Sequence, residues 1–488
     1  MNSLPSSVNY AESIPVLPFG TDNLKVNCVS TNGFSFTAGQ KIIVPLNKTG
    51  YLDPASLSIR YNLNLVVPIV LAASGVTGQS MSIPGCPAYT PILRLDTVFD
   101  SNLITSVNNY NSVATALTNL NYTTAQKMGK QSSLGYISQA WSAAPGVAPI
   151  PIVDYSTINE CTDGLTLAVG TGTAFDGLAT SYTVPLSAPL PCFLSNAEKL
   201  IPLKGSNIRL EFTLDSQTNV CPLAATQINN FTYVGTSLLN TALSIGQTEL
   251  GTKCVAGQFG TYTITNFEVV YNQVSFSQDV ERQILAMPKL RIKTTGYATG
   301  IQTIPARILG TFNLDYNLNY SSVKAILLLM GISSTGSGNV NYYPNKLFES
   351  IDVTGGQGSY IFKYNNVNYP QNELSVVNSK ASIITELGLA MDTEHMAIDQ
   401  LEFNKNDANV GPKSQSVITP GKFYIGVNTR KVYDKKIISG ISTKSGAITA
   451  SITLGQIATV YGYSAIMMLM YDGILEYNTK TNKLEYIM

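Results

Sequence analysis

The chain contains a single histidine, His395, and a Ser-His-Asp triad or a Cys-His pair would have to use it. It lies in the segment Met391-Asp-Thr-Glu-His-Met396, and the sequence holds no Gly-x-Ser-x-Gly motif that would supply a serine nucleophile. A single imidazole also argues against a zinc site built from histidines. We therefore interpret His395 as a structural residue.

Three carboxylates near this histidine, Asp392, Glu394 and Asp399, are candidates for the acid and base of a glycosidase or for a cation site. Their spacing follows no ligand pattern, so a solvated helix end is the favoured interpretation. The Gly-rich segments 354–359 and 170–172 could cradle a phosphate, but both lack the lysine of a phosphate-binding loop. We expect turns there.

Basic side chains gather loosely with two tyrosines in the last quarter of the chain, and such a group could contact nucleic acid or an inner membrane. Its members are Lys422, Tyr424, Arg430, Lys431, Tyr433, Lys435 and Lys436. Asp434 lies among them, which favours a solvated or intersubunit face. The sequence thus predicts no catalytic, cofactor-binding or metal-binding residue, and no enzyme.

Charged residues form only 12% of the 488 residues, about half of the usual share, and 30 basic side chains balance 30 acidic ones. Nucleic-acid binding needs clustered cations, so this composition argues against it. A net charge of zero suits a protein that packs against copies of itself. The apolar fraction of 44% is enough for a large core in two or more domains.

The cysteine pattern and the first residues of the chain both bear on the cellular compartment in which the protein would fold. Six cysteines lie far apart without a Cys-x-x-Cys pair, so we interpret them as free thiols in a reducing compartment. Residues 1–9 lack the basic region and apolar core of a signal peptide, and the apolar runs are too short to span a bilayer. We expect no secretion through a signal peptide.

The hydrophobic pattern predicts β-strands along most of the chain. In residues 56–67, five apolar side chains alternate with polar ones and share one face of a strand. Residues 261–276 form a second long candidate strand. The apolar run within 321–330 is continuous, which is typical of a strand buried on both faces. These patterns predict an all-β protein with short helices.

Two short helices interrupt the β pattern and resemble each other. Segments 111–121 and 378–388 share five of eleven residues, and in each an Asn-Ser pair is expected to cap the helix. Upstream of them, we match segment 95–100 of the first half with segment 347–352 of the second. The common order of strand, turn, helix and long loop predicts a duplicated β domain.

The domain organisation follows from this repeat and from composition. Residues 1–35 are rich in Pro, Ser and Asn and are expected to form an extended N-terminal arm, which carries only one cation, Lys25. Residues 36–284 would form the first domain, with a long inserted interaction loop at 128–183. Residues 285–488 would form the second domain.

Several segments resemble one family. They are Tyr51-Leu-Asp-Pro-x-x-Leu-x-Ile-Arg60, Leu95-x-x-x-Phe-Asp100 before the first helix, the turn and strand within 189–212, and the segment 359–370. In this order they are similar to double jelly-roll major capsid proteins of double-stranded DNA viruses. That family includes nucleocytoplasmic large viruses, virophages and polinton-like viruses.

The resemblance implies two consecutive eight-stranded antiparallel jelly-roll β-sandwiches with long inter-strand loops and with strands normal to a shell. It also implies homotrimers of pseudo-hexagonal outline that tile an icosahedral virion around a double-stranded DNA genome. The implied partners are further copies of the chain, penton proteins, minor capsid or cement proteins, and an inner membrane where one exists. The loop 128–183, with 215–260, would form an outward tower or an intersubunit clasp.

Two other functions are compatible with a β-sandwich chain. A glycan-binding or glycan-cleaving protein would use the same fold class, but the scarcity of paired titratable residues weakens that hypothesis. A penton or minor capsid component usually carries one jelly roll, whereas the repeat predicts two. We therefore expect a major capsid protein.

Overall fold

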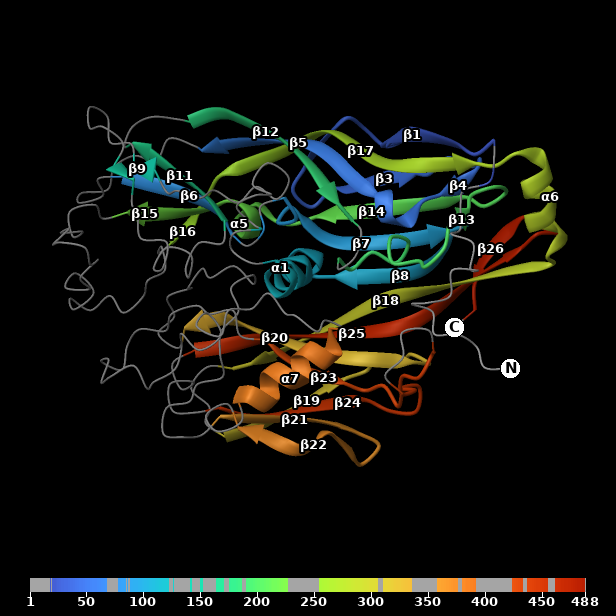
Figure 1. Cartoon of the computed structure of the whole chain (residues 1–488). Coiled ribbons are helices and arrows are strands. Elements are labelled where there is room, and N and C mark those ends of the chain that lie inside the picture. Colours follow the sequence, from blue (N-terminus) through green and yellow to red (C-terminus); the bar gives the residue numbers. More distant parts are fainter. Residues whose placement is uncertain are drawn as a thin grey trace.

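The computed structural model of the chain describes residues 18, 20–67, 78–84, 86, 88–122, 126, 141–142, 150–151, 164–170, 175–186, 190–226, 254–305, 310–335, 358–375, 380–391, 424–432, 437–454 and 461–487. Most of these residues lie in antiparallel β-strands that run along the long direction of the molecule (Figure 1). The strands form two sandwiches that lie side by side.

The first sandwich consists of two sheets. One has the order β12–β5–β17–β4–β13, with β1 and β2 also paired to β17, and the other has the order β3–β14–β7–β8. The bounds are β1 (Asp22–Val29), β2 (Ser35–Thr37), β3 (Lys41–Pro45), β4 (Tyr51–Leu52), β5 (Ser58–Val67), β7 (Ile92–Phe99), β8 (Asn102–Asn108), β12 (Phe175–Pro185), β13 (Ile201–Pro202), β14 (Ile208–Leu214) and β17 (Thr261–Ser275). Helix α1 (Tyr110–Asn121) follows β8, and the short α5 (Gln217–Val220) follows β14.

Smaller strands extend one end of this sandwich (Figure 1). They are β6 (Gly78–Pro84), β9 (Trp141–Ser142), β10 (Ile150–Pro151), β11 (Gly164–Gly170), β15 (Pro222–Thr226) and β16 (Cys254–Phe259). Four of them pair as β11–β6–β15–β16, and β10 pairs with β9. The predicted loop 128–183 therefore contains strands, and β12 begins inside it at Phe175. Much of that segment lies outside the described residues.

The second sandwich begins after helix α6 (Gln278–Ala286). Its sheets have the orders β18–β25–β20–β23, with β26 paired to β25, and β19–β24–β21–β22. The bounds are β18 (Lys289–Ile304), β19 (Gly310–Tyr316), β20 (Val323–Thr335), β21 (Ser359–Tyr364), β22 (Val367–Ser375), α7 (Lys380–Ala390), β23 (Ile425–Asn428), β24 (Ile448–Leu454), β25 (Tyr461–Asn478) and β26 (Lys483–Tyr486).

The two sandwiches repeat one strand order. In the first, β3–β14–β7–β8 carries α1 after β8, and in the second, β19–β24–β21–β22 carries α7 after β22. The facing sheets correspond as well, with β12, β5 and β17 matching β23, β20 and β25. Both hairpins before the helices turn through two residues with positive φ, Asp100-Ser101 and Asn365-Asn366. The duplication inferred from the two helices is confirmed.

Two details of that inference are wrong. The strand that takes the place of β7 is β21, at 359–364, so the match of 95–100 with 347–352 fails; 347–352 lies outside the described residues. Residues 359–370 form a hairpin, β21 with part of β22, because Asn365 and Asn366 adopt the left-handed turn conformation. The Asn-Ser pair also does not cap α1: Asn109 is the N-cap, without a side-chain bond.

The hydrophobic core confirms the periodicity read from the sequence. Alternate side chains of β5, from Ile59 to Leu65, are fully buried, as are the consecutive residues 323–330 of β20. One continuous cluster of buried residues runs through both sandwiches. Strand β1, by contrast, was expected to be part of an extended arm. It pairs with β17 from Asp22–Ser275 to Val29–Glu268, although most of its side chains are exposed.

Candidate functional site

The residues that could do chemistry lie mostly outside the described part of the chain. They are Asp392, Glu394, His395, Asp399, Lys422, Tyr433, Lys435 and Lys436, together with 354–357 and 171–172. Arg430 and Lys431 follow β23 at the surface. Tyr424 is fully buried in front of β23, so it cannot offer its ring to a nucleobase, and that part of the basic-cluster hypothesis is wrong.

Thiols and acids form no reactive group in the described residues. Cys28, Cys86, Cys192 and Cys221 form no disulfide bond, and burial raises the pKa of the Cys28 and Cys192 thiols. No three His, Cys, Asp or Glu side chains of this part of the chain lie together as metal ligands. None of its helices is long and apolar enough to cross a membrane.

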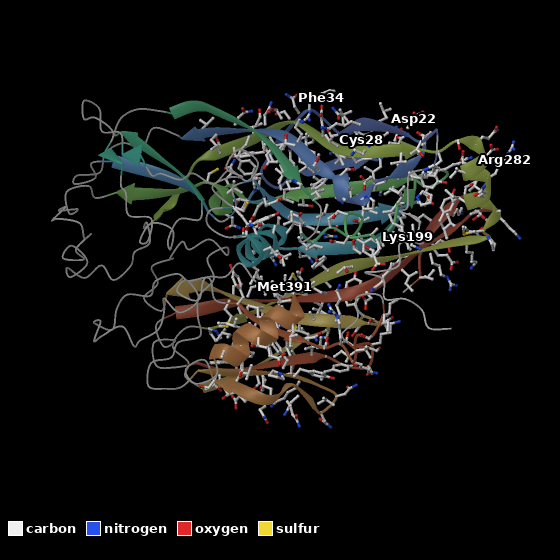
Figure 2. All side chains as sticks on the ribbon, in the orientation of Figure 1. Asp22, Cys28, Phe34, Lys199, Arg282 and Met391 are labelled. Carbon is white, nitrogen blue, oxygen red and sulfur yellow. The ribbon has the colours of Figure 1, made fainter. Side chains whose placement is uncertain are left out.

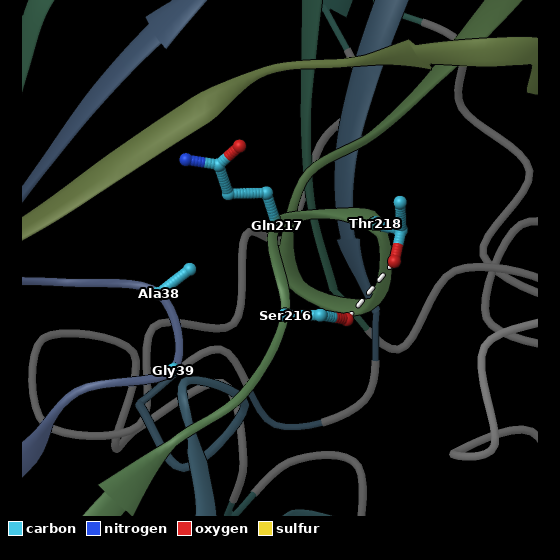
Figure 3. Close-up of a pocket in the computed structure, with 5 residues that line it drawn as sticks. All are labelled: Ala38, Gly39, Ser216, Gln217 and Thr218. Atoms are coloured by element: carbon cyan, nitrogen blue, oxygen red, sulfur yellow. Dashed lines mark hydrogen bonds between the residues drawn. The ribbon is translucent and has the colours of Figure 1, made fainter.

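A shallow hollow of about 430 Å³ lies beside α5 (Figure 3). Its lining residues are Ala38, Gly39, Ser216, Gln217 and Thr218. The hydroxyls of Ser216 and Thr218 are 2.9 Å apart and bond to each other. The lining holds no titratable side chain, so the hollow offers no acid, base or nucleophile.

Two acidic side chains lie opposite each other on β7 and β14, and the sequence did not indicate them. Asp96 and Glu211 are cross-strand partners, and their side chains are 3% and 7% exposed. Arg94 Nε lies 2.7 Å from Asp96 Oδ1, and Arg209 Nε lies 2.5 Å from Glu211 Oε1. Lys41, on β3, is ion-paired to both carboxylates.

Glu211 has the wrong electrostatics for a proton donor. Burial opposes ionisation of Glu211, but hydrogen bonds and charges from Lys41 and Arg209 outweigh it and lower the pKa of Glu211. A catalytic acid needs a raised pKa, as one member of a glycosidase pair has. The three cations around two carboxylates instead tie together the three strands β3, β14 and β7.

The junction between the two sandwiches is the largest organised contact outside the cores. Thr299 Oγ1 of β18 donates to the Asn108 carbonyl at the end of β8, at 2.8 Å. Thr294 Oγ1 of β18 donates to the Phe193 carbonyl at 2.6 Å. The Phe193 ring meets Tyr486 of β26 edge-on, with centroids 5.6 Å apart.

The loop 190–206, between β12 and β14, continues this junction. The Leu484 backbone N–H of β26 donates to Ser206 Oγ at 2.8 Å, and Tyr477 Oη donates to the Lys204 carbonyl at 3.2 Å. Gly205 lies between these bonds with φ +76°, packed against Asn482. In each of these hydrogen bonds a side chain of one sandwich meets a backbone group of the other, or the reverse, so both the side chains and the backbone hold the two sandwiches together.

Ion pairs border the junction. Lys293 of β18 lies 3.7 Å from Glu198 of the first sandwich and 3.9 Å from Asp472 of β25. The Glu198 backbone N–H also donates to the Lys293 carbonyl, at 2.9 Å. The Lys293 side chain is only 16% exposed. Its charge therefore attracts a carboxylate of each sandwich in a partly desolvated site.

Comparisons with known proteins agree with this architecture. No protein-family model and no curated protein matches the chain. A structure of the Sputnik virophage matches it at 11% identity and TM-score 0.57, over 100% of this chain and 93% of that one. VP54 of the virus PBCV-1 matches at 10% identity and TM-score 0.54, over 98% and 99%. The mavirus major capsid protein matches at 10% identity and TM-score 0.52, over 100% and 95%.

The chain has the double jelly-roll fold. The matches span nearly the full length of both chains, so they include both sandwiches and their relative placement. The predicted fold class, all-β with two consecutive antiparallel jelly rolls and short helices, is confirmed. At 10–11% identity the likeness concerns the fold.

The double jelly roll contains no assembled catalytic group among its described residues. Sequence reasoning missed the junction because its contacts join residues far apart in the chain. Gly205 gave the one local signal, since glycine in Lys204-Gly-Ser206 permits a left-handed turn.

The carboxylate pair gives a pH prediction. Replacing Glu211 by glutamine is expected to lower the free energy of unfolding by about 1–3 kcal/mol at pH 7, since Lys41 and Arg209 lose a buried anionic partner. The lowered pKa means that Glu211 stabilises the fold above its unfolded pKa of about 4.3. That contribution disappears as the pH falls through the folded pKa. Denaturant unfolding of both proteins from pH 7 to pH 3 measures it.

The matched control is Glu268→Gln, because Glu268 pairs with Arg60 across 3.8 Å at a more exposed site. This control is expected to lose less than about 1 kcal/mol. A Glu211→Gln protein whose deficit stays constant down to pH 3 would contradict the assignment.

Proposed function

We propose that this double jelly roll is a major capsid protein that self-assembles as homotrimers of pseudo-hexagonal outline into an icosahedral shell enclosing a double-stranded DNA genome. The observation that carries the proposal is the full-length match to the mavirus major capsid protein and to a PBCV-1 virus capsid. The similarity covers both jelly rolls of the chain and nearly all of each matched chain, at TM-scores of 0.52.

The architecture supports this function physically. Two similar sandwiches in one chain supply six sandwiches in a trimer. Six such units in a ring give the hexagonal outline needed to tile a face of an icosahedron. A surface with few charges and no net charge permits close lateral contact between copies. The division into a first jelly roll (36–284) and a second (285–488) belongs to the proposal.

Partners and location follow from the same proposal. The chain would reside in the virion, after assembly inside a host cell, and would contact neighbouring trimers, penton proteins and minor capsid or cement proteins. An inner membrane is a further surface for viruses that have one. The strands β9, β10, β11, β15 and β16, which lie within 128–183 and 215–260, extend one end of the first sandwich (Figure 1), and these two segments would form an outward tower or a clasp between subunits. The chain would act without enzyme activity and without sequence-specific contact to the genome.

Electron microscopy of the purified, concentrated chain tests the proposal. We expect particles of hexagonal outline that arrange into sheets or closed shells. The rival function, a glycan-binding β-sandwich protein, predicts isolated single-chain particles that bind on a glycan array. Isolated particles with reproducible glycan binding would overturn the capsid proposal.

A further inference from the structure

The surfaces that meet at the junction inside the chain have counterparts elsewhere in the same chain. At this junction, the end of β8 and the loop 190–206 of the first sandwich contact β18 of the second, and α1 lies on the side of the first sandwich that faces the second (Figure 1). Because both sandwiches share one strand order, each of these surfaces has a counterpart. The counterparts of β8, α1 and the loop are β22, α7 and the segment 429–447, and the counterpart of β18 is the pair β1 and β2.

Helix α7 leaves exposed the residues whose equivalents in α1 are buried. Thr118 Oγ1 donates to the Ala114 carbonyl in α1 at 2.7 Å, and Thr385 Oγ1 donates to the Ala381 carbonyl in α7 at 2.9 Å. These are the same two residue types at the same spacing in both helices. Ala114 and Thr118 are fully buried, whereas Ala381 and Thr385 are exposed.

The exposed side of α7 is also apolar. Leu389 lies two turns beyond Ala381 on the same side of the helix and is 38% exposed. The helix packs its other side, with Ile383 and Leu387, against its own sandwich. We call Ala381, Thr385 and Leu389 the α7 face. Ala381 and Thr385 match buried residues of α1 in type, but in a single chain the α7 face is exposed to solvent.

The strand pair β1–β2 is open in the same way. Counted from the first pairs of the two ladders, Asp22–Ser275 and Lys289–Asn478, Val29 takes the place of Gly296. The loop 30–34, which ends at Phe34, then takes the place of Tyr297 and Ala298.

Exposure differs sharply between these counterparts. Gly296 is buried and Val29, in its place, is 52% exposed; Tyr297 and Ala298 are 4% and 2% exposed, while Phe34 is 76% exposed. Figure 2 shows Phe34 on the side of the first sandwich that faces away from the second. We call Val29 and Phe34 the β1–β2 face.

The loop between β23 and β24 completes the parallel. Its counterpart, 190–206, places Phe193 and Glu198 against β18. The segment 429–447 instead exposes two branched apolar side chains, Val432 at 51% and Ile437 at 48%. Figure 1 shows β1 and β22 at opposite ends of the stack of sheets, so one chain cannot bring its two open faces together.

We propose that the α7 face of one copy, with Val432 and Ile437, packs on the β1–β2 face of a second copy, and that this contact repeats the junction inside the chain. The contact is head-to-tail, because two different surfaces meet, and three such contacts close a ring of six sandwiches. The inference rests on the proposed function, of which it names the subunit interface.

Sedimentation velocity of the full-length chain and its surface variants tests this interface. Phe34→Asp and Leu389→Asp each place a charge in the contact, and each variant is expected to sediment as a monomer where the unaltered chain is a trimer. Val367→Asp is the matched control. Val367 begins β22 as Asn102 begins β8. Leu103, next to Asn102, is 54% exposed, so the internal junction does not cover the start of β8, and the proposed contact should not cover Val367. The control is expected to remain a trimer.

A mixture of the two variants tests that the faces belong to one contact. Each variant keeps one intact face, so equal amounts at high concentration are expected to form a species of two copies that cannot close into a ring. A mixture that stays monomeric would overturn the pairing of these two faces.

Folding and function are separated by further measurements. Thermal unfolding shows whether each aspartate variant is folded, and Phe34→Ser and Leu389→Ser replace any that is not. If the unaltered chain is a trimer and either folded variant remains one, the interface proposal is wrong while the capsid proposal stands. If the unaltered chain is a monomer, the capsid proposal itself fails.

Discussion

Replacing Gly205 by alanine is expected to lower the free energy of unfolding by about 2–4 kcal/mol, through backbone strain and overpacking together. Gly205 has φ +76°, a conformation that costs an L-residue about 1–2 kcal/mol. A Cβ there would also collide with the carbonyl oxygen of Asn482 and lie 2.6 Å from its Cβ, so the β25–β26 turn must move. That movement would strain the bonds that Tyr477 and Ser206 make across the junction.

Gly39→Ala separates the two causes. Gly39 has φ +77°, almost the same backbone conformation, but no atom lies within 4 Å of the position that an added methyl group would take. It is expected to cost only about 1 kcal/mol. Denaturant unfolding of both variants measures the difference. Equal losses at Gly39 and Gly205 would contradict the close packing of the junction.

Replacing Asp215 by alanine is expected to cost about 2–4 kcal/mol and to loosen the start of α1, because it removes one partner from a buried polar network. Asp215 is 4% exposed, and its carboxylate accepts bonds from Asn111 Nδ2 at 2.6 Å, the Ser216 backbone N–H at 2.7 Å and Asn219 Nδ2 at 3.0 Å. Alanine would remove the acceptor from all three donors, and Asn111 Nδ2 would keep only its longer bond to the Thr90 carbonyl, at 3.2 Å. Asn111 in α1 is 2% exposed, so water does not easily replace the carboxylate.

Asp315→Ala is the control for this prediction. Asp315 is exposed on β19 and accepts a bond from Thr449 Oγ1 at 2.5 Å, so its loss is expected to cost less than about 1 kcal/mol. Hydrogen exchange of α1 amides gives a second readout, since Asp215→Ala should raise their exchange rates selectively. A loss below about 1 kcal/mol with unchanged exchange would show that α1 does not depend on this network.

The regular parts of the fold were predictable because burial leaves a period in the sequence. Strand β5 alternates since one of its faces lies in the core, and β20 is continuously apolar since both faces are covered. The two helices were visible as a repeat because Ala114 with Thr118 and Ala381 with Thr385 have the same residue types at the same spacing, and in both helices the threonine hydroxyl donates to the alanine carbonyl.

Other elements carried no such period. Strand β1 is exposed over most of its length, and it pairs with β17 through backbone hydrogen bonds. Such bonds leave no hydrophobic pattern in the sequence. The start of β12 was taken as loop because it lies in a long stretch rich in Gly, Ser, Ala, Thr and Pro. The match of 95–100 with 347–352 failed because short motifs recur by chance, whereas the strand order identifies β21.

The candidate site was less predictable than the fold. Lys41, Asp96 and Glu211 lie on three strands that are distant in sequence, and only the pairing of β3, β14 and β7 brings them together. The same holds for Asn108 with Thr299 across the junction. Residues that meet through long-range strand pairing leave no local spacing in a single sequence.

The mass of the purified chain in solution tests the capsid proposal most directly. One chain has a mass of 52.4 kDa, and sedimentation equilibrium is expected to give a stable species of about three times that mass. The species should persist on dilution, because three head-to-tail contacts close into a ring without free ends. A chain that stays at 52.4 kDa at every concentration would contradict the capsid proposal.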